Sequence, residues 1–177
     1  KKFSKTTIVA DMKIMDAGRT EVEIAAKAGA NIVCVLGAAS DATIKECIEA
    51  GHNYGAKIQA DLIAIKDVKK RAMEIAKLGV DYIGIHCSID EQMRGKDPFR
   101  DLKEIAKIIP TPIAVAGGIN SETAPLAVKA GATILIVGGA INKAKDAKKA
   151  ARTIKNSIKQ LKAIKTGLFK RGSEKDI

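Results

Sequence analysis

Short apolar segments alternate along this chain with longer amphipathic segments at a nearly constant spacing. The short segments are rich in Ile, Val, Leu and Ala, and we predict six buried β-strands at residues 7–10, 32–36, 58–60, 82–86, 113–116 and 134–137. The segments between them carry apolar residues at helical spacing, and we predict that they are helices. A repeated strand and helix predicts a parallel sheet with right-handed crossover connections.

One phrase recurs through the chain and supports this reading. Residues 26–33 (AKAGANIV) return as residues 128–135 (VKAGATIL), with weaker versions around Gly55 and Gly79. Each copy has the form of a helix end, a glycine just past the helix and then a buried strand. A regular strand and helix repeat predicts either a closed barrel or an open sheet.

We favour an α/β fold of the (β/α)8 TIM-barrel class, because no repeat reverses direction or breaks the period. Such a barrel needs eight strands, so we expect six βα units here, the third to the eighth, with about two units before Lys1. An open, doubly wound sheet of six strands is the alternative. Residues 1–164 would form the partial barrel domain, and residues 165–177 a connector to a possible following domain.

Composition narrows the class of protein. The chain is 46% hydrophobic but only 3% aromatic, which is typical of parallel strands covered by helices. It has neither an apolar run of membrane-spanning length nor a signal-peptide pattern. The cysteines Cys34, Cys47 and Cys87 show no metal spacing, and we expect reduced, buried thiols in a cytoplasmic protein without a membrane partner.

The net charge of +11 is concentrated at the end of the chain. Twelve Lys and Arg stand against three Asp and Glu from Lys143 onward. Alanine, isoleucine and leucine recur at helical spacing between residues 147 and 161, with basic residues between them. We expect an amphipathic helix with a solvated basic face, and no nucleic-acid partner, because the segment has no aromatic side chains to stack on bases.

Charged residues follow the first predicted strand. Asp11, Lys13 and Asp16 lie between that strand and the next predicted helix, at the edge of a parallel sheet where catalytic groups are placed. The alternative is a solvated loop with ordinary surface charges. Asp61 follows the third predicted strand and could line the same site, although an ion pair with Lys13 is equally compatible with its position.

Glycine pairs and a histidine follow the later strands. Gly117 and Gly118 follow the fifth strand, and Gly138 and Gly139 the sixth. Bare backbone N–H groups at the last two strands of a barrel commonly bind phosphate, although a glycine pair is also an ordinary tight turn. His86 ends the fourth strand and could transfer protons near neutral pH, unless it is a hydrogen-bonded core residue.

These motifs together resemble a known family. Residues 10–18 (ADMKIMDAG) resemble the Asp-x-Lys-x-x-Asp motif of the orotidine 5′-phosphate decarboxylase superfamily. Within that superfamily, their sequence is most similar to the 3-hexulose-6-phosphate synthase branch. The resemblance extends from residue 6 to residue 161, and it continues in residues 85–93 (IHCSIDEQM), 95–98 (GKDP), 114–119 (AVAGGI) and 136–141 (IVGGAI).

The resemblance implies a lyase of the carbohydrate metabolism of the ribulose monophosphate pathway. The reaction is the reversible aldol condensation of formaldehyde with ribulose 5-phosphate to a 3-hexulose 6-phosphate, through an enediolate stabilised by Mg²⁺ or Mn²⁺. By the same resemblance, Asp11 would bind the metal or a substrate hydroxyl, and Lys13 would stabilise the enediolate. Asp16 would orient Lys13 and approach the partner's site in a homodimer, and His86 would be the general acid and base.

Two departures from the family pattern bear on function. The related 3-keto-L-gulonate-6-phosphate decarboxylases carry an arginine three residues after the strand-end histidine, where this chain has Ile89, which favours the synthase over a decarboxylase. The family also places an Asp on its first strand and a metal-binding Glu on its second. Neither of these strands is among the six that we predict here, so we expect these 177 residues alone to be inactive. A non-catalytic basic binding module is the remaining alternative.

Overall fold

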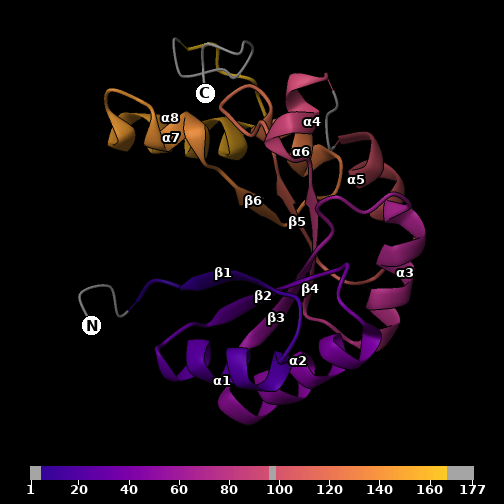
Figure 1. Ribbon diagram of the computed structural model, residues 1–177. Helices are drawn as coiled ribbons and strands as arrows, with labels where there is room; N and C mark the ends of the chain where they lie inside the picture. The colour runs from indigo at the N-terminus through magenta and orange to yellow at the C-terminus, as the bar shows by residue number, and fades with distance from the viewer. Residues whose placement is uncertain (1–4, 96–98, 167–177) are drawn as a thin grey trace. The chain divides into compact units, whose positions relative to one another are not determined.

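The computed structural model describes residues 5–95 and 99–166 (Figure 1). It divides into two compact units, Lys1–Gly84 and Ile85–Ile177, and the boundary falls within the fourth strand. Because the described residues end at residue 166, the predicted connector at residues 165–177 lies almost wholly outside them.

The first unit is a series of parallel strands and helices. Its elements are β1 (Val9–Ile14), α1 (Gly18–Lys27), β2 (Ile32–Leu36), α2 (Asp41–Tyr54), β3 (Lys57–Asp61), α3 (Val68–Leu78) and the beginning of β4 (Tyr82–His86). β1 pairs with β2, β2 with β3, and β3 with β4, all in parallel. Helices α1 and α2 pack on each other, and Val22 of α1 and Ile44 of α2 are fully buried. The apolar face of each helix thus completes the core beside the strands.

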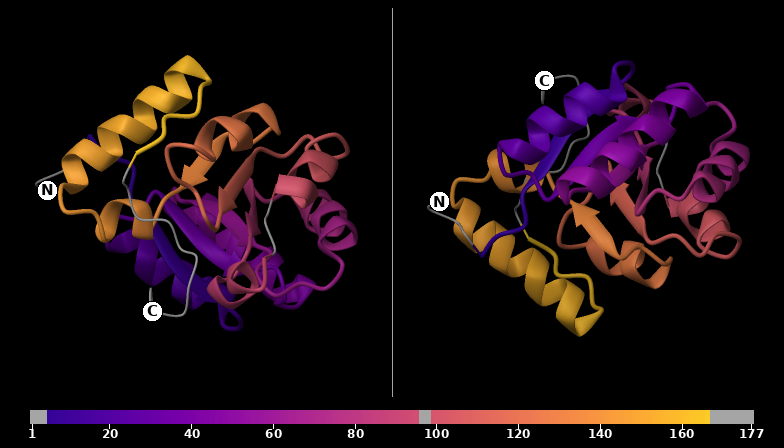
Figure 2. Two further views of the ribbon diagram at one scale, coloured as in Figure 1. Left: turned by 90° about the horizontal axis from the view of Figure 1, so that it is seen from above. Right: turned by 90° about the horizontal axis from the view of Figure 1, so that it is seen from below.

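The second unit continues the alternation. It contains the end of β4, α4 (Ile89–Met93), α5 (Phe99–Ile105), β5 (Ile113–Ala116), α6 (Ala124–Lys129), β6 (Ile134–Ile136), α7 (Gly139–Asn142) and α8 (Ala147–Gln160), which Figure 2 shows from two further directions. β5 pairs with β6 in parallel, and the N–H of Cys87, just past β4, donates to the Ala116 carbonyl at 3.2 Å. The sheet order follows the chain order from β1 to β6.

All six predicted strands are present, and three have the predicted bounds. The α/β class with parallel strands is therefore confirmed. The glycines past the helices are confirmed as helix ends, because Gly55 and Gly79, for example, have φ values of +73° and +95° and cap α2 and α3.

The predicted end of the first strand was wrong. β1 continues to Ile14 through an irregularity in its pairing with β2. Ala10 pairs with Val33 and Ile14 with Val35, so three residues of β1 lie opposite the single residue Cys34. This is a β-bulge, in which unpaired residues re-aim their side chains. Asp11 and Lys13 thus lie within the strand, and Lys13 has a φ of +50°.

Helix α8 has the amphipathic form that its sequence predicts. Ala150, Ile154 and Ser157 are buried, and α8 packs on α6 and α7. The basic face of the helix, namely Lys148, Lys149, Arg152, Lys155 and Lys159, is exposed. None of the helices in residues 5–95 and 99–166 combines the length and apolar character that a membrane span requires.

Candidate functional site

The first unit holds a cluster of three charged residues. The Lys13 ammonium lies 2.9 Å and 3.1 Å from the two carboxylate oxygens of Asp11, and 2.8 Å from Oδ2 of Asp61. Asp61 is the buried member, since its side chain is 6% exposed, against 32% for Lys13 and 59% for Asp11. A buried carboxylate requires a partner, and the predicted alternative of an ion pair between Asp61 and Lys13 is confirmed.

The backbone fixes this cluster from both sides. The second oxygen of Asp61, Oδ1, accepts a hydrogen bond from the N–H of Ile63 at 2.9 Å, and the Asp61 carbonyl accepts one from Gly37 at 2.7 Å. Asp11 and Lys13 lie two residues apart in the bulge of β1, and there the Lys13 ammonium contacts the Asp11 carboxylate. The strand can adopt this local shape because the extra residues of the bulge are not paired with residues of β2.

The cluster keeps Lys13 protonated. Burial alone would lower the pKa of the Lys13 ammonium, but the hydrogen bonds and negative charges of Asp61 and Asp11 outweigh it and raise the pKa above its usual value of 10.5. Lys13 is therefore a fixed cation at neutral pH. A protonated amine is not a nucleophile, so this arrangement suits charge stabilisation and disfavours a Schiff base.

We expect a pH effect on stability from this raised pKa. The contribution of Lys13 to the free energy of unfolding is complete below about pH 10.5, the unfolded value, and is lost as the pH rises through the higher folded-state pKa. Chemical denaturation between neutral pH and pH 12 measures it. In a Lys13→Arg variant the guanidinium stays charged, so its stability relative to the parent protein is expected to rise above pH 10.5. A constant difference between the two proteins would contradict the raised pKa.

Asp16 does not join the cluster. Its side chain is exposed, and within the described part of the chain the ion pairs of Lys13 go to Asp11 and Asp61. The contact with Lys13 that was expected of Asp16 is instead made by Asp61. Cys34 lies opposite the bulge and is buried. Its burial is the main cause, and the negative charges of Asp11 and Asp61 are smaller causes, that raise the pKa of its thiol to about 12. The three cysteines are free and buried, as predicted.

Asp11 is the residue that the sequence predicts to bind a metal ion. Its exposed carboxylate is a hard oxygen donor, which suits Mg²⁺. No group of three His, Cys, Asp or Glu side chains that could hold a metal ion occurs in residues 5–95 and 99–166. The carboxylate of Asp11 has the donor chemistry of one Mg²⁺ ligand.

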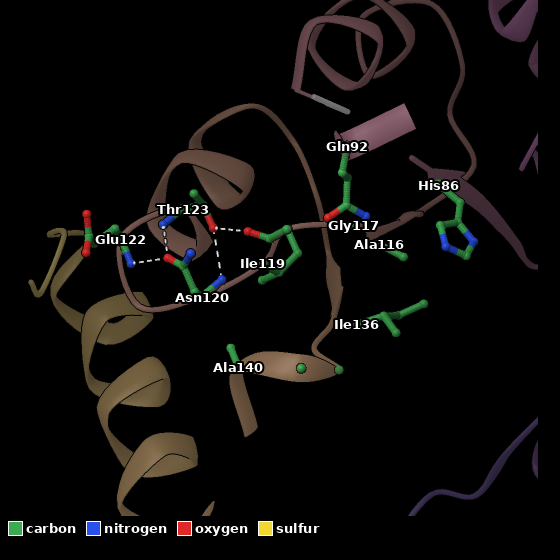
Figure 3. Close-up of a pocket in the computed structure, with 13 residues that line it drawn as sticks. His86, Gln92, Ala116, Gly117, Ile119, Asn120, Glu122, Thr123, Ile136 and Ala140 are labelled. Atoms are coloured by element: carbon green, nitrogen blue, oxygen red, sulfur yellow. Dashed lines mark hydrogen bonds between the residues drawn. The ribbon is translucent and has the colours of Figure 1, made fainter. Parts of the chain in front are cut away.

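The second unit holds a pocket of about 470 Å³, shown in Figure 3. His86 lines it from the end of β4, Gly117 and Gly118 from the loop after β5, and Gly138 and Gly139 from the start of α7. The structure therefore brings the predicted histidine and both predicted glycine pairs to one cavity. The other histidine, His52, is exposed in the last turn of α2.

Hydrogen bonds hold the loop after β5 in shape. The Asn120 side-chain oxygen accepts from the N–H groups of Glu122 and Thr123 at 2.8 Å and 3.1 Å. The Thr123 hydroxyl accepts from the Asn120 N–H and donates to the Gly118 carbonyl, both at 2.9 Å (Figure 3). The glycine turn is thus tied to the residues before α6, and a preorganised turn binds a ligand at a lower entropic cost.

Ile119, Asn120 and Ala140 also line the pocket, and they belong to the segments just past the fifth and sixth strands where the sequence predicts the site. Sequence reasoning missed five further lining residues: Gln92, Ala116, Glu122, Thr123 and Ile136. Asn and Thr three residues apart after a glycine pair are typical of a side-chain-stabilised turn. That pattern could have identified Thr123 as the partner of Asn120. Gln92 lies in the family-like segment 85–93, but the place of its side chain in the pocket depends on how α4 lies against the loop after β5, which the sequence does not give.

A valine at Gly138 tests whether the glycine backbone receives the phosphate. A Cβ atom built on Gly138 meets no atom within 4 Å, so Gly138→Val is expected to fold and to intrude only on the pocket. We expect KM for a phosphorylated ketose to rise about tenfold, which corresponds to about 1.4 kcal/mol of binding free energy. Steady-state kinetics and the thermal unfolding midpoint measure the two effects.

Gly117→Ala is the contrasting variant. Its Cβ atom would lie 2.6 Å from the Cys87 carbonyl oxygen at a φ of +104°, so it is expected to lower the unfolding midpoint as well. An unchanged KM in folded Gly138→Val protein would place the phosphate elsewhere.

Comparison with known protein families gives one match over most of the chain. The sequence pattern of the Orotidine 5'-phosphate decarboxylase / HUMPS family matches residues 1–154. A 3-hexulose-6-phosphate synthase of Bacillus subtilis (strain 168) is 42% identical over 159 residues, which cover 89% of this chain and 76% of that protein.

Solved structures agree with the sequence comparison. The crystal structure of a 3-hexulose-6-phosphate synthase from Salmonella typhimurium superposes with a TM-score of 0.86 at 35% identity, covering 90% of this chain and 76% of that one. A crystal structure of KGPDC from Streptococcus mutans has a TM-score of 0.78 at 26% identity, covering 90% of this chain and 74% of that one.

Proposed function

Because the chain belongs to the orotidine 5′-phosphate decarboxylase / HUMPS family, we propose that it is a lyase with the activity of its 3-hexulose-6-phosphate synthase relatives. The reaction joins formaldehyde to ribulose 5-phosphate and gives a 3-hexulose 6-phosphate. The observation that carries the proposal is the cation of Lys13, fixed between Asp11 and Asp61. Such a fixed cation can stabilise the negative charge of an enediolate.

The reaction requires a proton to leave a carbon beside the carbonyl of the ketose. We assign this transfer to His86, because it lines the pocket at the end of β4 and an imidazole can accept and return a proton near neutral pH. The enediolate carbon then forms a bond with the formaldehyde carbon. The formaldehyde oxygen takes up a proton from the imidazolium and becomes a hydroxyl, so the acid and base are restored and nothing is released.

The remaining roles are part of the same proposal, and the surroundings of each residue support them. Lys13 holds positive charge for the enediolate oxygens, and Asp61 holds Lys13 in place. The backbones of Gly117, Gly118, Gly138 and Gly139 would receive the phosphate group, since all four line the pocket. Asp11 would bind a substrate hydroxyl or a divalent cation, Mg²⁺ or Mn²⁺. That cation, when bound, would supply Lewis-acid stabilisation of the enediolate.

The assembly and location of the enzyme are further parts of the proposal. The exposed position of Asp16 is compatible with a place near the partner's site in a homodimer. Three buried, free cysteines support a reducing, cytoplasmic environment. Six βα units corresponding to the third to eighth of a (β/α)8 barrel remain our interpretation of the fold.

The decarboxylation of a sugar-phosphate acid is the second candidate, favoured by the likeness to the 26% identical KGPDC structure. The test, made on the intact protein, is an assay of formaldehyde consumption with ribulose 5-phosphate and Mg²⁺, run beside an assay of CO2 release from 3-keto-L-gulonate 6-phosphate. We expect formaldehyde consumption to have the higher kcat/KM. Faster CO2 release would overturn the proposal in favour of the decarboxylase. Activity in neither assay, together with steeply salt-dependent binding to nucleic acid, would favour a basic binding module.

A further inference from the structure

Gln92 lines the pocket of the second unit but has no part in the chemistry proposed above. It belongs to α4, a helix of five residues that begins directly after the His86–Ser88 segment. Figure 3 shows its amide beside Gly117, and the His86 ring lines the same pocket. The residue therefore shares the pocket with the proposed acid–base group and the proposed phosphate turn.

The Gln92 amide has a specific contact with the backbone next to His86. Its Nε2 donates to the Cys87 carbonyl at 2.9 Å. The Cys87 N–H donates in turn to the Ala116 carbonyl at the end of β5. The backbone N–H of the buried Cys87 is thus held by β5, and its carbonyl is held by Gln92. Because Cys87 follows His86 directly, these two bonds restrict the direction in which the histidine leaves the backbone.

The same carbonyl lies against the glycine turn. A Cβ atom built on Gly117 would lie 2.6 Å from the Cys87 carbonyl oxygen and 3.1 Å from Nε2 of Gln92. A Cβ atom built on Gly118 would lie 3.6 Å from Oε1 of Gln92. The Gln92 amide therefore bonds to the segment that carries His86 and lies beside the turn at Gly117 and Gly118.

The base of α4 is braced, which fixes the origin of this side chain. Ser88 and Glu91 form a capping box, in which the Ser88 hydroxyl accepts from the Glu91 N–H at 3.3 Å and the Glu91 carboxylate accepts from the Ser88 N–H at 3.2 Å. The Gln92 N–H donates to the Ser88 carbonyl at 2.9 Å. A helix this short has little stability of its own, so these side-chain contacts define where Gln92 points.

We propose that Gln92 is a positioning residue, which holds the Cys87 carbonyl and so sets the distance between His86 and the Gly117–Gly118 turn. This inference rests on the proposed function in one respect, the roles given to His86 and the glycine turn. A ligand that spans both groups, as a ketose phosphate would, then depends on Gln92 in binding and in turnover. A purely structural glutamine would affect only the stability of the fold.

The test is Gln92→Met, which keeps the length of the side chain and removes the amide. Asp90→Asn is the matched control, because Asp90 is exposed on the same helix. In the intact protein we expect Gln92→Met to raise KM for ribulose 5-phosphate and to lower kcat, each about fivefold or more, while Asp90→Asn stays near the parent protein. Parental kcat and KM with only a lower unfolding midpoint would overturn the proposal.

A second readout does not depend on turnover. The chain has two histidines, so the ring signals of His86 and His52 can be followed separately by NMR during a titration with inorganic phosphate. We expect phosphate to shift the His86 signals in the parent protein and the dissociation constant to rise about fivefold or more in Gln92→Met. An equal dissociation constant in the two proteins would refute the role of Gln92, whereas absent aldol turnover with a normal titration would refute only the proposed reaction.

Gln92→Asn provides the same test if the methionine variant does not fold. The shorter side chain keeps the amide but is one methylene short of the Cys87 carbonyl. The same losses are expected in both readouts, and parental values in this variant would equally overturn the proposal.

Discussion

Asp11→Asn in the intact protein is expected to lower kcat by about 10³-fold while the protein remains folded, because it removes the carboxylate charge at the centre of the proposed chemistry. Asn has nearly the same shape as Asp, and the Asp11 side chain is 59% exposed. Its substitution therefore leaves no buried polar group without a partner. The measurement is steady-state turnover of formaldehyde and ribulose 5-phosphate at saturating Mg²⁺, with the unfolding midpoint recorded for each protein.

Glu49→Gln is the matched control for this substitution. Glu49 is an exposed carboxylate on α2 that pairs with Arg19 at 3.7 Å. Its loss removes the same charge from the same unit, and we expect near-parental turnover. A kcat of Asp11→Asn close to the parental value would show that Asp11 is neither a metal ligand nor a substrate ligand.

Lys13→Met is expected to lower both activity and stability. The variant removes the cation proposed to stabilise the enediolate, so we expect kcat/KM to fall by about 10²- to 10³-fold. It also removes the ammonium from Asp61, whose side chain is 6% exposed. The loss of one partner of a buried charge is expected to cost about 2–3 kcal/mol of unfolding free energy. Steady-state kinetics and chemical denaturation measure the two effects separately.

Lys13→Arg separates charge from geometry. The guanidinium keeps the positive charge and can still pair with Asp61, so most of the stability is expected to return. Turnover is expected to stay low, because the larger, planar group cannot occupy the position of the ammonium between Asp11 and Asp61. Full activity in Lys13→Met would exclude a role of this cation in the reaction.

The alternation of short apolar and longer amphipathic segments was sufficient to predict the six strands and the helices between them. This was possible because burial on both faces of a parallel strand imposes a local pattern that each segment carries by itself. The helix ends at Gly55 and Gly79 were equally predictable from the sequence. Both glycines have a positive φ, a backbone conformation that other residues adopt only at a cost in free energy. Asp11, Lys13, Asp61 and the glycine pairs were also identified as candidates, because residue type and nearness to a strand end can be read from the sequence, but Asp16, predicted with them, lies outside the charged cluster.

The bulge at Asp11 and Lys13, the pairing of Lys13 with Asp61 rather than Asp16, and the place of Gln92 were decided by the tertiary structure. Each depends on groups far apart along the chain: Cys34 opposite the bulge, Asp61 on β3, and the Cys87 carbonyl against Gly117. The sequence states that a lysine and three carboxylates are available, but the choice among partners follows from strand register and burial. Asp61 prevails over Asp16 because a buried carboxylate gains most from a cation, whereas an exposed one is already solvated by water.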